Sequence, residues 1–165
     1  MKSLIKIISQ AFVLPTDVSM EFYKTCQRGE QLDCRLTIKS RESAIDVEKI
    51  SVALMAEENV EVDAGNQSGY DLEDGDAMVT IHVGTVTSET ITVNEIITVS
   101  NAINLEPNRE YSWKANFVVP KNCNATYRGV HAHHIWFLRA TITLANRKLL
   151  RKKNFSYTWD GLIVS

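Results

Sequence analysis

The feature that most constrains this chain is an alternation of apolar and polar residues with a period of two. It is longest between Val130 and Ala145. Successive side chains of a β-strand point to opposite faces, whereas a helix would repeat every three or four residues. The segment therefore predicts one long strand. One face of it is predicted to carry Ala132, His134, Trp136, Leu138, Ala140, Ile142 and Leu144.

The same alternation recurs along most of the chain, and turn residues separate its segments. About eight strands with only one short helix predict an all-β fold, an antiparallel immunoglobulin-like β-sandwich. A length of 165 residues suits a single domain over residues 1–165. The predicted strands are 18–23, 32–39, 47–55, 77–83, 87–99, 111–119, 130–145 and 149–157.

Two segments depart from this pattern. In residues 3–12, Leu4, Ile8 and Phe12 recur at a spacing of four, which predicts a short amphipathic helix. A helix this short is unstable alone, so we expect it to dock on the domain's own sheet. Residues 57–76 hold eight acidic residues, three glycines and no Lys or Arg, which predicts an acidic loop or a poorly ordered hairpin.

The basic residues gather in the second half of the chain. Between Tyr111 and Trp159 there are nine Lys or Arg and no acid. Opposite charge on two parts of a molecule can steer a protein partner or a second copy of the chain. The net charge of -2 argues against nucleic acid as the partner, and a membrane surface is the weaker alternative. The candidate partner-binding residues are Arg147, Lys148, Arg151, Lys152 and Lys153. Their alternative role is to protect an edge strand against aggregation.

The cysteines indicate a reducing compartment. Cys26, Cys34 and Cys123 form no Cys-x-x-Cys pair, and three thiols cannot all pair within the chain. Lys6 interrupts the apolar N-terminal stretch, which is untypical of a signal peptide. No window approaches the roughly 18 apolar residues that a membrane span needs. We therefore expect a cytoplasmic protein.

The histidines are the main candidates for chemistry. His131 and His133 would share a strand face, close enough to chelate one metal ion, and His82 could be brought in as a third ligand. This arrangement would make the chain a metal-binding protein or a hydrolase. The simpler interpretation is that they are surface histidines at the start of a strand, with no catalytic residue and no cofactor.

Two stretches of the chain resemble an arrestin-like domain. The first joins the turn Arg28-Gly29-Glu30 to the strand Ile45-Asp-Val-Glu-Lys-Ile50-Ser-Val-Ala-Leu54. The second joins Tyr111-Ser-Trp-Lys-Ala-Asn-Phe117-Val-Val-Pro120 to Gly129 and a long strand that ends in Trp136-Phe-Leu-Arg-Ala140. The apolar segment before the first strand is similar to the start of the bacterial sporulation-control relatives of arrestin. The resemblance runs from residue 3 to about residue 145.

This resemblance implies an immunoglobulin-like sandwich that serves as an adaptor or scaffold, with no catalytic residues. Arrestins and sporulation-control proteins carry two such sandwiches, and this chain has room for one, comparable to the N-terminal half of the latter. The polar cluster that arrestins use to sense phosphate has no match here. We expect a non-enzymatic module that binds a protein partner, or a second copy, through a sheet edge. A phage or viral structural β-sandwich is a further alternative.

Overall fold

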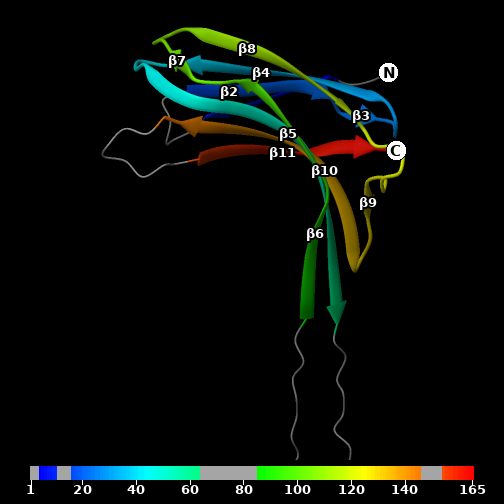
Figure 1. Cartoon of the computed structure of the whole chain (residues 1–165). Coiled ribbons are helices and arrows are strands. Elements are labelled where there is room, and N and C mark those ends of the chain that lie inside the picture. Colours follow the sequence, from blue (N-terminus) through cyan, green and yellow to red (C-terminus); the bar gives the residue numbers. More distant parts are fainter. Residues whose placement is uncertain (1–3, 11–15, 64–84, 146–153) are drawn as a thin grey trace, which may run out of the picture.

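The computed structural model describes residues 4–10, 16–63, 85–145 and 154–165, and every helix or strand assigned in them is a β-strand. The strands form two sheets (Figure 1). One has the order β1-β2-β4-β8; the other has the order β3-β11-β10-β5-β6, with β7 paired to β5 and β9 to β10. The strands are β1 (Leu4–Gln10), β2 (Thr16–Tyr23), β3 (Thr25–Cys26), β4 (Gln31–Ser40), β5 (Ile45–Asp63), β6 (Thr85–Ser100), β7 (Ile103–Leu105), β8 (Glu110–Val118), β9 (Tyr127–Arg128), β10 (Ala132–Leu144) and β11 (Asn154–Val164).

Both sheets contribute to one hydrophobic core. From the first sheet, Leu36 and Phe117 are fully buried, and from the second, Leu54, Leu138 and Ile142 are fully buried in the same cluster. Burying one such side chain stabilises the fold by about 1.5–3 kcal/mol. The alternation along each strand therefore has a direct cause, since the face turned toward the other sheet is the apolar one.

The long strand predicted over Val130–Ala145 is confirmed as β10. The inner face of β10, which is turned toward the first sheet, is buried from His134 to Ile142 at every second residue. On the outer face most residues are partly exposed, but Phe137 is only 3% exposed. The partner strand predicted over residues 149–157 is present from Asn154 as β11, and it continues to Val164.

The predicted helix over residues 3–12 is wrong. Leu4–Gln10 form β1, which pairs antiparallel with β2 from Leu4 opposite Tyr23 to Gln10 opposite Asp17. The isoleucines of this segment are β-branched and favour a strand. Pairing with β2 also satisfies its backbone hydrogen bonds, whereas so short a helix gains little by itself.

Of the two alternatives for residues 57–76, the acidic loop is wrong for residues 57–63, which belong to β5. The ladder with β6 continues as far as Asp63 opposite Thr85. All four acids of this part of β5 lie opposite uncharged residues of β6, such as Thr90 opposite Glu58, so the pairing adds no direct repulsion. Residues 64–76 and the predicted strand 77–83 lie outside the described residues. The predicted strand 87–99 is confirmed as β6.

The sheets are not purely antiparallel as predicted. β11 has a bulge opposite β10, because Phe137 pairs with Asp160 and Trp136 with Leu162, which leaves Gly161 as the extra residue. Gly161 has a φ of 113°, a conformation that glycine adopts without strain. Beyond it, β11 pairs in parallel with β3. This change of partner could not be read from the local pattern of the sequence.

Candidate functional site

β6 forms one edge of the second sheet. It pairs with β5 on one side, and among the residues that the structure describes no strand pairs with its other side. Its 16 residues include no proline, lysine or arginine, which proteins commonly use to protect an edge. The end of β5 at Asp63 and the start of β6 at Thr85 project together away from the two sheets (Figure 1). We call this paired extension the β5–β6 hairpin. β6 therefore presents backbone N–H and C=O groups to which another strand can add.

The outer face of the second sheet, which is turned away from the first sheet, carries an apolar patch. Ile91 and Ile96 of β6 are 57% and 59% exposed. The register places Ile96 beside Ala53 of β5, and Ile91 lies on the same face. On the same face, β5 and β10 carry a second buried cluster, formed by Ala53, Met55 and Phe137 with Ile135 packed against it. The edge of β6 is thus bordered by apolar side chains that are exposed to solvent.

A bulge in β6 explains why both isoleucines share a face. Val93 pairs with Ala56 and Ile91 with Glu57, so Thr92 is an extra residue in the ladder. In a regular strand, positions 91 and 96 would point to opposite faces. The bulge shifts the alternation by one residue and brings them together.

The bulge is held by a buried histidine. His134 is fully buried, and its Nε2 lies 2.7 Å from the hydroxyl oxygen of Thr92. Its Nδ1 lies 3.2 Å from the carbonyl oxygen of Ala125. Because a carbonyl only accepts, Nδ1 donates to Ala125, and Nε2 shares the second hydrogen bond with the Thr92 hydroxyl. The ring stacks on Tyr127 and meets the edge of Trp136, with centroid distances of 5.9 and 5.8 Å.

Tyr127 and Trp136 complete this polar cluster at the base of the hairpin. The hydroxyl of Tyr127 donates to the carboxylate of Glu58 on β5, and this bond, with burial and the charge of Glu58, raises the pKa of Tyr127. The indole N–H of Trp136 donates to the carbonyl of Asn124 over 3.0 Å. These bonds join β5, β6, β9 and β10. The cluster fixes how the hairpin leaves the sheets.

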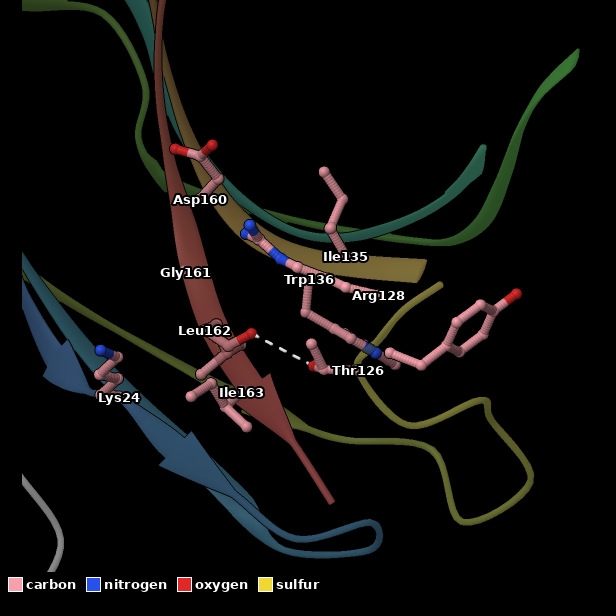
Figure 2. Close-up of a pocket in the computed structure, with 10 residues that line it drawn as sticks. Lys24, Thr126, Arg128, Ile135, Trp136, Asp160, Gly161, Leu162 and Ile163 are labelled. Carbon is pink, nitrogen blue, oxygen red and sulfur yellow. Dashed lines mark hydrogen bonds between the residues drawn. The ribbon is translucent and has the colours of Figure 1, made fainter. Parts of the chain in front are cut away.

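A cavity of about 390 Å³ lies beside the bulge of β11 (Figure 2). Its volume is near the lower end of the range for small-molecule pockets. One wall is the end of β11, where Ile163 N donates to Lys24 O over 2.7 Å and Val164 N donates to the Thr126 hydroxyl over 2.9 Å. Its other lining residues include Arg128, Ile135, Trp136 and Asp160.

The histidines predicted as metal ligands are placed in part. His131 is exposed in the bend before β10, and His133 lies on the outer face opposite Asn59. Among the described residues, no group of three or more His, Cys, Asp or Glu is arranged to hold a metal ion. His82 lies outside those residues, so the metal hypothesis stays a prediction.

The predicted partner-binding residues also lie outside the described part of the chain. They are Arg147, Lys148, Arg151, Lys152 and Lys153, and their role stays a prediction. Sequence reasoning missed the role of His134. The available signal was its position, because a polar ring on the apolar face of β10 must find buried partners.

The structure is similar to the crystal structure of Spo0M, a sporulation control protein from Bacillus subtilis, with a TM-score of 0.55. The fold is arrestin-like. The two sequences are 10% identical, and the similarity covers 98% of this chain and 48% of Spo0M, so this chain spans about half the length of that protein. No protein-family model and no curated protein matches the sequence. The described residues contain no helix long and apolar enough to cross a membrane.

Proposed function

We propose that this chain is a non-enzymatic adaptor domain that binds another protein by accepting a strand at the free edge of β6. The observation that carries this proposal is the combination of an open edge and the exposed Ile91 and Ile96 beside it. In strand addition, backbone hydrogen bonds supply affinity, and alternate side chains select the partner. An arrestin-like fold is compatible with this role.

The side chains of β6 define the partner strand. Its outer face must place apolar side chains against Ile91 and Ile96. Glu89 and Glu95 are exposed on the same strand, so residues opposite them must be uncharged or basic. The partner is therefore an extended segment without acids at those two positions.

The proposal also includes the architecture of the domain, its correspondence to Spo0M and its location in the cell. The shared core of the two sheets supports an immunoglobulin-like sandwich. Coverage of about half of Spo0M supports a correspondence to one half of that protein. The choice of its N-terminal half rests on the resemblance of the apolar segment before the first predicted strand. Cys34 is a buried free thiol, which supports a cytoplasmic location.

The test selects, from a random library, peptides that bind the protein at low concentration. Hydrogen exchange then maps where each peptide binds. We expect the selected peptides to carry alternating apolar residues and to slow hydrogen exchange of the β6 amides. The variant Ile91→Lys/Ile96→Lys should no longer bind these peptides. A matched control, Val118→Lys/Val130→Lys, replaces two other exposed apolar residues and should keep them. Peptides that protect a different surface, or no selected peptide, would contradict the proposal.

A further inference from the structure

We propose that the strand accepted by β6 is β6 of a second copy of this chain, paired antiparallel about Asn94. This inference rests on the edge function proposed above. It names the partner, which that function leaves open. The result is a dimer in which the second sheet of one copy continues into the second sheet of the other.

The register follows from the faces of β6. Directly opposite residues of an antiparallel pair project to the same face. With Asn94 opposite its own copy, the bulge at Thr92 brings Ile96 opposite Ile91. Both isoleucines lie on the outer face, so the dimer forms two symmetric Ile–Ile pairs. The pairs in order are Asn94 with Asn94, Glu95 with Val93, Ile96 with Ile91 and Thr98 with Glu89.

Charge favours the same register. In this pairing Glu95 lies opposite Val93 and Glu89 opposite Thr98, so no acid faces an acid. Moving the centre to Glu95 would set this acid opposite its own copy, and like charges directly opposite destabilise a strand pair. Moving the centre to Val93 would set no acid opposite an acid, but it would place Ile91 opposite Asn94 and Ile96 opposite Glu89, so the Ile–Ile pairs would be lost. The spacing of the acids and the pairing of the isoleucines therefore together favour the centre at Asn94.

The size of the contact sets the strength of the dimer. A pair of about ten-residue strands buries less than the roughly 1,600 Å² of a standard protein interface. We expect a dimer in dynamic exchange with the monomer, with the apolar patches of the two copies joined across the axis. The exposed Ile91 and Ile96 become covered in this state.

Sedimentation of the full chain over a wide concentration range tests the dimer. The wild type should shift from monomer to dimer, and Ile91→Lys/Ile96→Lys should weaken association roughly tenfold or more, because four like charges then meet. The charge-swapped variant Ile91→Lys/Ile96→Glu places opposite charges across the axis and should dimerise more tightly than the double-lysine variant. A monomer at every concentration would overturn the proposal.

A cysteine on the axis tests the register. In a Cys123→Ser background, Asn94→Cys should form an intermolecular disulfide on mild oxidation, since the Cα atoms of directly opposite residues lie about 4.5–5.5 Å apart, within the range that a disulfide spans. Thr98→Cys, which is equally on β6 but far from its own copy, should not. Equal crosslinking of both variants would overturn the register. If the wild type is a monomer but still binds library peptides at β6, only the second copy as partner is overturned. If it neither dimerises nor binds peptides at β6, the edge function itself is rejected.

Discussion

At the residue scale, Gly161 decides where the end of β11 goes. Its φ of 113° strains any residue with a Cβ, and a Cβ built there meets nothing within 4 Å. Backbone strain of this kind costs about 1–3 kcal/mol, and no steric clash adds to it. We expect Gly161→Ala to lower the free energy of unfolding by about that amount, as measured by urea denaturation.

Asp160→Ala is the matched control, because Asp160 is an exposed neighbour with ordinary strand geometry. A surface substitution of this kind should change the free energy of unfolding by no more than about 0.5 kcal/mol. If Gly161→Ala were equally harmless, the change of partner from β10 to β3 would not depend on the glycine.

The cysteines differ in reactivity for a physical reason. Burial raises the pKa of Cys34 to about 12, and burial also raises the pKa of the half-buried Cys123. The thiolate is the reactive form, so a raised pKa shifts modification to higher pH than for a free cysteine. We expect a thiol reagent near neutral pH to modify Cys123 slowly and to leave Cys26 and Cys34 unmodified, as measured by mass spectrometry. All three should react in denaturant, and rapid modification of Cys34 in the native protein would contradict the described core.

At the scale of the elements, the bulge in β6 depends on a single side-chain bond. Thr92→Val keeps the shape of the side chain but removes the hydroxyl that forms a hydrogen bond with His134. A buried ring nitrogen then lacks a partner, which costs about 1–3 kcal/mol. We expect a corresponding loss in the free energy of unfolding, with faster hydrogen exchange in the β5–β6 hairpin.

Thr90→Val provides the control, because Thr90 is exposed on the same strand. It should leave the stability of the protein nearly unchanged. Equal effects of the two substitutions would show that His134 does not hold the bulge.

The same scale shows what the sequence could predict. Segments with a long alternation, such as Ala132–Leu144, were assigned correctly because their buried face and their period agree. The segment Leu4–Gln10 is predicted wrongly, because apolar residues can fall at a spacing of four by chance in a short apolar segment. Its pairing with β2 decides that it forms a strand and not a helix. Glu57–Asp63 was missed because composition suggested a loop, while the ladder with β6 supplied the backbone bonds.

At the scale of the whole molecule, the pairing of distant strands lay beyond sequence reasoning. The parallel pairing of β11 with β3 joins residues near Ile163 to Thr25, which no local pattern connects. The open edge was expected for an antiparallel fold, but its place on β6 depends on which strand ends the sheet. His134 likewise gained its role only when the fold brought Thr92 and Ala125 to it.

The salt dependence of self-association separates two mechanisms for the whole molecule. Attraction between the acidic and basic parts of two copies would weaken strongly as salt is added, since exposed charges are screened over about 8 Å at physiological ionic strength. Edge pairing through β6 rests on backbone hydrogen bonds and on Ile91 and Ile96, and it brings no opposite charges together. We therefore expect the dimer dissociation constant to stay the same or to fall slightly with added salt, because screening relieves the repulsion between two strands that each carry Glu89 and Glu95. Sedimentation at low and high salt measures this directly, and a dimer that dissociates at high salt would assign association to the charged faces instead.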